Sequence, residues 1–278
     1  VYVPYEQLAK VEVFNTKAAI NIANNTTNIT SWDRESKDAV TTILDNKHNL
    51  NFIYTDSNYV YIQRLNENMG VRDTLKIQKR YPIYGDTIVD DDGNYYIAWG
   101  QNDTSPESTG KITFVISKYS NSGSYISSYE KTDSPKPVEK PPATGEQEEI
   151  RKEEPTKTIF ANGTCNLDIN SKGIIAYNYA KETEAGLQCN SSGYIDSNTM
   201  KEARDYKVYP YAAHSWATDV IALSNGDFAF LQQTDMQKRS YDVSLITQNV
   251  DKKYTEYNRQ MFHFREGLAK QAGYYYTF

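Results

Sequence analysis

The chain has few of the features that mark several common protein classes. No run of about 18 apolar residues occurs, so we expect no membrane-spanning helix. Thirty basic residues stand against 36 acidic ones and give a net charge of -6. This is not the basic excess that contact with a nucleic-acid backbone requires, so nucleic acid is not an expected partner. Val1 opens the chain without the charged and then apolar leader of a signal peptide, which favours a mature N-terminus from which such a peptide has been removed.

Cysteine is also scarce, with two residues in the whole chain. Cys165 and Cys189 flank a segment that has the pattern of one β-hairpin. That arrangement could close a single disulfide in an oxidising compartment, and two separate reduced thiols are the alternative. Two cysteines are too few to establish the compartment by themselves.

Tyrosine is abundant, with 24 residues in a chain whose mean hydropathy is -0.72. Tyrosine supplies side-chain area that can be half buried and half wet, as in a soluble β-rich protein. A short phrase recurs, in which a polar turn precedes β-branched and aromatic residues. Turn residues that tolerate positive φ, followed by such residues, predict hairpins of antiparallel sheets. The phrase occurs at 55–58 before 59–62, 91–94 before 95–99, 171–173 before 174–177, and 224–227 before 228–231.

Recurrence at intervals of tens of residues predicts an all-β, propeller-like array of antiparallel blades. Four strands, near 86–90, 94–100, 111–118 and 124–130, would form one blade. An earlier repeat has strands near 50–55, 58–65 and 73–79, and residues 33–45 are either a short helical connection or a strand. Another strand is expected near 260–264. Either residues 1–32 and 254–278 join in a closing blade, or the array is incomplete.

Residues 132–157 interrupt this pattern with five of the nine prolines and twelve charged residues. Such a segment cannot bury enough apolar area to offset its ordering entropy, which predicts a flexible Pro/Glu/Lys-rich insert. A domain linker is the alternative. We expect the repeats of residues 1–131 and 158–278 to belong to one propeller-like domain, because similar phrases occur on both sides.

Several phrases together resemble a known group of proteins. These are 86–89 leading into 93–102, then 112–119, then Thr164 and Cys165 with 174–180, and finally 213–216. In that order they are similar to poorly characterised secreted or surface β-propeller-like proteins of clostridia and related Firmicutes, over roughly residues 45–265. The resemblance implies an extracellular or cell-surface scaffold, and it brings no catalytic residue with it.

The chain offers little support for a catalytic, metal or cofactor site. His214 next to Ser215 could suggest a hydrolase, but no Gly-x-Ser-x-Gly turn presents a nucleophile, so a structural histidine is favoured. The histidines lack metal-ligand spacing. The cluster of oxygen ligands around Gly93 lacks the calcium-loop pattern and is typical of a solvated hairpin turn. We therefore predict no catalytic residue, no metal and no cofactor.

Aromatic and amide side chains are the best candidates for ligand binding, because they combine stacking faces with hydrogen-bonding groups. Packing inside the sheets is the alternative for each aromatic residue. The predicted function is a non-catalytic extracellular binding or adhesion module for a glycan or protein. One alternative is a secreted glycoside hydrolase or lyase that uses carboxylates such as Asp86 and Asp90. Another is a structural subunit that assembles through open edge strands. The candidate ligand-binding residues are Trp99, Gln101, Asn102, His214 and Trp216.

Overall fold

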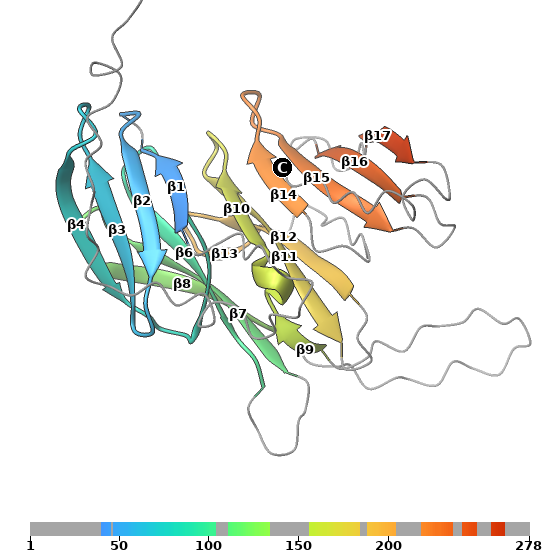
Figure 1. Ribbon diagram of the computed structural model, residues 1–278, viewed down its shortest axis with the longest axis horizontal. Helices are drawn as coiled ribbons and strands as arrows, with labels where there is room; N and C mark the ends of the chain where they lie inside the picture. The colour runs from blue at the N-terminus through green and yellow to red at the C-terminus, as the bar shows by residue number, and fades with distance from the viewer. Residues whose placement is uncertain are drawn as a thin grey trace, which may run out of the picture.

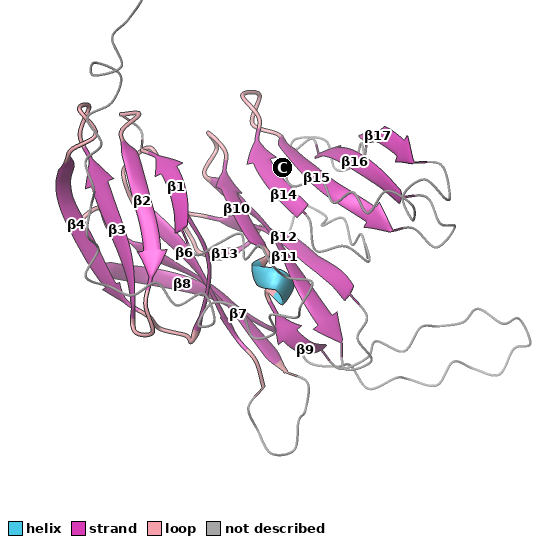
Figure 2. Ribbon diagram, in the orientation of Figure 1, coloured by secondary structure: helices cyan, strands magenta, loops and turns pink. Residues whose placement is uncertain are grey.

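The fold is an all-β, propeller-like array of four antiparallel sheets (Figures 1 and 2), which confirms the predicted fold class. The computed structural model describes residues 40–45, 47–103, 111–133, 156–183, 188–203, 218–235, 241–248 and 257–264. In this part of the chain no helix has the length and apolar character needed to cross a membrane.

Each sheet is one blade whose strands follow in chain order. Blade 1 contains β1 (Val40–Leu44), β2 (Leu50–Thr55), β3 (Tyr59–Leu65) and β4 (Val71–Gln78). Blade 2 contains β5 (Ile83–Val89), β6 (Tyr95–Gln101), β7 (Ile112–Tyr119) and β8 (Tyr125–Asp133). Blade 3 contains β10 (Cys165–Ile169), β11 (Ile174–Thr183), β12 (Gln188–Asp196) and β13 (Lys201–Glu202), and β9 (Thr156–Ile159) also pairs with β11. Blade 4 contains β14 (Thr218–Ala222), β15 (Phe228–Asp235), β16 (Tyr241–Gln248) and β17 (Tyr257–Phe264).

The strands of the first two blades lie close to where the sequence predicted them. The segment 33–45, for which helix and strand were both considered, contains strand β1, as its β-branched residues favoured. The strand expected near 260–264 also exists. It is β17, which pairs with β16 and completes blade 4.

The innermost strands of successive blades contact one another, β1 with β5, β5 with β10, and β10 with β14. Each leads into a tight turn before the second strand of its blade. Gly93, Gly173 and Gly226 stand in these turns with φ of 81°, 74° and 86°, a backbone conformation that glycine adopts without steric cost. Their N–H groups donate to the carbonyl three residues earlier. In blade 1 the equivalent residue is His48, with φ of 59°.

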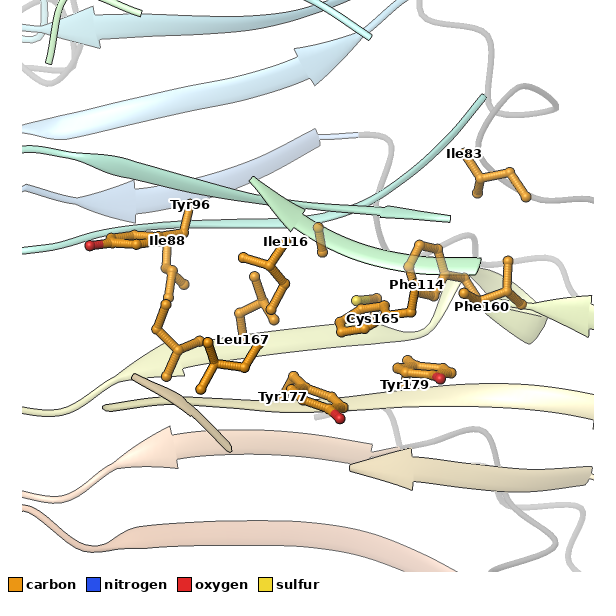
Figure 3. Packing of buried hydrophobic residues seen from close by; sticks show 14 of the residues in the cluster. Ile83, Ile88, Tyr96, Phe114, Ile116, Phe160, Cys165, Leu167, Tyr177 and Tyr179 are labelled. Atoms are coloured by element: carbon orange, nitrogen blue, oxygen red, sulfur yellow. The ribbon is translucent and has the colours of Figure 1, made fainter. Parts of the chain in front are cut away.

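Three hydrophobic cores hold the blades together, one at each junction between consecutive blades. In the core between blades 2 and 3, Phe114 stacks on Tyr179 at 4.6 Å between ring centroids and meets Phe160 edge-on at 6.1 Å (Figure 3). Gly100 makes room for Phe160, because a Cβ there would lie 2.8 Å from the Phe160 ring. Aromatic rings are therefore packed between the sheets together with the aliphatic side chains of the same cores.

The two cysteines lie on strands that are separated by β11. Cys165 is buried in β10 opposite Tyr179, and Cys189 is opposite Lys181 from the other side of β11. Two inter-strand spacings amount to about 10 Å, whereas bridged cysteines have Cα atoms within about 7 Å. A bridge would thus have to reach across β11. The side chain of Cys189 lies outside the described part of the structure, so the disulfide stays a prediction that thiol titration in denaturant without reductant tests.

Residues 1–39 and 134–155 also lie outside the described residues. The predicted insert falls on the second of these segments, and it stays a prediction, as does the division into residues 1–131, 132–157 and 158–278. β8 extends to Asp133 and β9 begins at Thr156. The strands therefore reach slightly into the predicted insert at both ends.

Candidate functional site

A pocket of about 730 Å³ opens where the turns of blades 2, 3 and 4 meet. The turns between the first two strands of each of these blades supply most of its wall, and the turn between β12 and β13 and Lys118 of β7 supply the rest. The lining residues are 89–92, Lys118, 168–173, 197–198 and 222–224.

Side-chain hydrogen bonds fix the turn of blade 2. The Oδ1 of Asp90 accepts from the backbone N–H of Asn94 at 2.8 Å, and its Oδ2 accepts from the Asn94 amide and the Tyr96 hydroxyl at 2.9 Å each. The pKa of the Tyr96 hydroxyl is raised by burial and by its bond to this carboxylate. An aspartate that accepts from the residues after it is a local device for closing a turn. This explains why Asp-x-x-Gly-Asn precedes β6.

The turn of blade 3 is built in the same way and is also tied to blade 4. The Oδ1 of Asn170 accepts from the N–H groups of Lys172 at 3.0 Å and Ile174 at 2.9 Å. Its Nδ2 donates to the carbonyl of Gly226 at 2.7 Å. On the other side of the pocket, Lys118 Nζ donates to the carbonyl of Ser197 at 3.2 Å. The pocket wall is therefore held together across both blade junctions.

Two aspartates on inner strands link neighbouring blades near the pocket. Asp168, which lines it, accepts through Oδ2 from the N–H of Ala222 at 2.6 Å. Asp86, on β5, accepts through Oδ2 from the N–H of Leu167 at 2.8 Å. Each also accepts through Oδ1 from the N–H of the residue that follows it. Each carboxylate therefore joins the inner strand of its own blade to the backbone of the next blade.

The protein environment raises the pKa of both carboxyls. Asp86 keeps some solvent contact but is set deeply in the protein, and this burial raises its pKa to about 7 against the lowering effect of its two N–H bonds. The carboxylates of Asp219 and Asp168 raise it further. Burial also raises the pKa of Asp168, opposed by the N–H groups of Ala222 and Ile169. Desolvation disfavours the charged form of a carboxyl group, which accounts for the direction of both shifts.

The groups that the pocket presents to solvent are mixed in kind. Among its lining residues the exposed ones carry carboxylate, hydroxyl, ammonium and amide groups, namely Asp91, Asp92, Ser171, Lys172, Asn198 and Ser224. Such a surface can donate to and accept from a polar ligand at many points. Within the described residues no group of three or more His, Cys, Asp or Glu side chains is arranged to hold a metal ion.

Three of the ligand-binding residues predicted from the sequence lie in the described part of the chain, and none of these three lines the pocket. Trp99 is 0% exposed and packs edge-on against Tyr84 in the core between blades 1 and 2. It therefore packs inside the sheets, which was the alternative to ligand binding, and its ring cannot stack on a ligand. Gln101 is exposed, but it ends β6 at the end of the sheet away from the pocket. Asn102 accepts through Oδ1 from the N–H of Ile159 at 2.8 Å and so joins blade 2 to β9. His214 and Trp216 lie outside the described residues.

Sequence reasoning missed the pocket because its residues belong to turns, which were interpreted only as connections between strands. The signal was present in the glycines: three inner turns with the same left-handed glycine must lie at the same end of the array. Serine, asparagine and lysine within those turns then come together from different blades. Aromatic content, which guided the predicted binding residues, points to the cores instead.

No protein-family model and no curated protein matches this chain. Among solved structures, it is similar to an endo-1,4-β-xylanase from Bacteroides thetaiotaomicron, at 11% identity and a TM-score of 0.45, over 80% of this chain and 75% of that one. A second is the α-L-arabinanase of Penicillium chrysogenum complexed with arabinobiose, at 12% identity and a TM-score of 0.41, over 81% and 68%. A third is an ulvan lyase, at 10% identity and a TM-score of 0.42, over 79% of this chain and 56% of that one. Likenesses of this degree carry no argument about what the present chain binds or does.

Proposed function

We propose that this protein is a non-catalytic extracellular binding module, and that the pocket between the turns of blades 2, 3 and 4 takes a polyhydroxylated ligand such as a glycan chain. The observation that carries the proposal is the mixed set of donors and acceptors that three blades bring to one cavity of about 730 Å³. A sugar needs this mixture, because each hydroxyl group both donates and accepts a hydrogen bond. The secreted or surface location implied by the family resemblance belongs to the same proposal.

The hydrogen bonding of Asp90 and Asp168, the two less exposed carboxylates of the pocket, favours binding over catalysis. Both oxygens of Asp90 accept hydrogen bonds from Asn94, and one of them also accepts from Tyr96. Both oxygens of Asp168 accept backbone N–H groups. A general acid or base must direct an oxygen at the substrate. These two carboxylates instead use their oxygens to hold the turns and strands in place.

The test is direct binding of the full chain to a glycan array, followed by titration of each hit. Asn198→Ala and Lys172→Ala remove exposed polar groups of the pocket wall and should each weaken binding by about 3- to 10-fold, the worth of one hydrogen bond or somewhat more. Asn68→Ala is the matched control. Asn68 and Asn198 each stand third in a turn between the two outer strands of a blade and donate through N–H to the side chain two residues earlier, but Asn68 lies in blade 1, away from the pocket.

The proposal would be contradicted if Asn68→Ala weakened glycan binding as much as Asn198→Ala, or if no glycan bound at all. Unchanged melting temperatures in all three variants confirm that the fold is intact. The same hits should be incubated with the wild-type protein and analysed for shorter products.

A glycoside hydrolase or lyase is the second candidate, because Asp168 lines the pocket and burial raises its pKa. A carboxyl whose pKa is raised above its usual value is what a general acid of glycoside hydrolysis requires. Steady product release from a hit glycan that is lost in Asp168→Asn, with binding retained, would establish this alternative. Binding without any product supports the non-catalytic module.

A further inference from the structure

Three buried polar side chains come together on one face of blade 2. Strands β6 and β7 pair with Ile97 opposite Ser117. Trp99 stands two residues further along β6, and Tyr119 stands two residues further along β7. Residues opposite each other in a sheet, and residues two apart along a strand, point to the same side. Trp99, Ser117 and Tyr119 therefore share the face that packs against blade 1, and both aromatic rings belong to the core between blades 1 and 2. We call these three residues the polar trio.

None of the three polar groups finds a hydrogen-bond partner within the described residues. The exposed fraction is 0% for Trp99, 0% for Ser117 and 3% for Tyr119. The indole Nε1 and both hydroxyl oxygens are themselves buried, and each is left without a hydrogen bond from the described part of the chain. Buried polar groups are almost always hydrogen-bonded, because otherwise the bonds that they made to water in the unfolded chain are lost on folding. The polar trio therefore needs a partner from outside the chain.

The three groups lie close enough together to share one partner. Burial raises the pKa of the Tyr119 hydroxyl, and the Ser117 hydroxyl and the Trp99 N–H act against this rise. Both groups thus interact with the Tyr119 oxygen, although neither has the geometry of a direct hydrogen bond to it. Buried polar groups that face one another without bonding are typical of a site that one small molecule bridges.

Another pair of polar groups on the same face of blade 2 shows the contrast. Thr87 lies opposite Ile97 on β5 and is 0% exposed. Its hydroxyl lies 3.0 Å from the hydroxyl of Tyr84, so these two buried groups bond to each other directly. Side chains at this junction therefore do pair where they stand close enough, and the polar trio does not.

The chemistry of the polar trio selects the molecule that bridges it. The indole N–H can only donate, so the bound atom must accept, whereas each hydroxyl can both donate and accept. None of the three groups carries a charge, and a buried ion without an opposite charge is costly. Water is neutral, both donates and accepts, and makes about three hydrogen bonds when it is buried in a protein.

We infer that one water molecule is bound inside the core between blades 1 and 2, where it accepts from the Trp99 N–H and bridges the hydroxyls of Ser117 and Tyr119. This water would satisfy all three members of the polar trio at once. The site belongs to a different junction from the pocket of blades 2, 3 and 4, so it is independent of the proposed ligand binding.

A crystal structure of the full wild-type chain at atomic resolution tests the inference directly. We expect an ordered water oxygen at about 2.6–3.2 Å from each of Trp99 Nε1, Ser117 Oγ and the Tyr119 hydroxyl oxygen. The inference is overturned if no ordered water lies within this range of all three atoms, or if the three groups bond directly to one another.

Oxygen-17 magnetic relaxation dispersion tests the same site in solution, because it counts the water molecules that stay inside the protein. Ser117→Val removes one hydroxyl partner and fills its space with methyl groups, so the count should fall by about one water per chain. Thr87→Val is the matched control, because its hydroxyl is equally buried but bonds directly to Tyr84, and the count should not change.

A count that stays the same in Ser117→Val, or that falls as much in Thr87→Val, would contradict the inference. Cooperative thermal melting of both variants shows that they are folded. If Ser117→Val does not fold, the crystal structure of the wild-type protein decides the question by itself, since it requires no substitution.

Discussion

The carboxylate of Asp86 in blade 2 accepts a hydrogen bond of 2.8 Å from the backbone N–H of Leu167 in blade 3. The two residues lie 81 positions apart in the chain, and the bond joins two inner strands that belong to different sheets. The pKa of Asp86 is raised to about 7, chiefly by burial, so the protonation of this group matters at this junction near neutral pH.

Asp86→Asn should reduce the loss of stability between pH 5 and pH 8. The folded-state pKa of about 7 lies above the usual value of 3.8. The contribution of this carboxyl to stability is therefore complete below about pH 4 and is lost as the pH rises through 7. After allowing for its partial solvent contact, the loss in the wild type should be on the order of 2 kcal/mol. Urea unfolding at the two pH values should show this difference in the wild type, and a smaller one in the variant.

Asp56→Asn is the control for the direction of this pH dependence of stability, because the pKa of Asp56 is shifted the opposite way. Partial burial raises the pKa of Asp56, but hydrogen bonds from the Asn58 and Tyr59 N–H groups and the Tyr61 hydroxyl outweigh it and lower the pKa. Its stabilising contribution is present above about pH 4 and is lost at more acidic pH. The variant should therefore lose a similar amount of stability at pH 5 and pH 8, about 1 kcal/mol. A change in the pH dependence of stability like that expected for Asp86→Asn would contradict the lowered pKa of Asp56.

Gly100→Ala should destabilise the junction between blades 2 and 3. The added Cβ would lie 2.8 Å from both the Ile159 side chain and the Phe160 ring, which are packed in the core and cannot easily move. Overpacking of this kind costs about 1–3 kcal/mol. Gly70→Ala is the matched control, because its Cβ would meet only the end of the Asn66 side chain, at 3.2 Å, and should cost less than about 0.5 kcal/mol. Thermal melting of the two variants measures the difference.

Trp99→Ala should lower stability by about 3–5 kcal/mol, because its indole is completely buried between blades 1 and 2. Gln101→Ala, two residues along the same strand but exposed, should change stability by less than about 0.5 kcal/mol. Chemical unfolding of both proteins measures the two costs. If Trp99→Ala weakened glycan binding without any change in stability, the assignment of Trp99 to the core would be wrong.

The strands and the repeat were predictable because their signals are local. β-branched and aromatic residues mark the strands, and the glycines at 93, 173 and 226 mark three inner turns. The turn of blade 1 was missed because His48 takes the left-handed position that glycine takes elsewhere. The phrase at 55–58 was grouped with the inner turns but joins the second and third strands of blade 1.

The site was much less predictable, since it depends on contacts between residues far apart in the chain. β6, in the middle of blade 2, is covered on both faces, so Trp99 has no solvent side whichever way it points. In the sequence Asp86 and Asp168 resemble other strand residues. Only the structure shows that each accepts a hydrogen bond from a backbone N–H of the next blade. The glycines indicate only that the three turns share one end of the array, and the packing of neighbouring blades creates the pocket.

The separate cores at the three junctions have a consequence for how the chain folds as it is synthesised. Each core draws its buried residues from two consecutive blades, and none of them requires a strand from a third. Blades 1 and 2 can therefore bury their shared core while blades 3 and 4 are still on the ribosome, in the way that repeat proteins propagate structure from neighbour to neighbour. An emerging chain of this design can bury apolar area before its last blade has been synthesised.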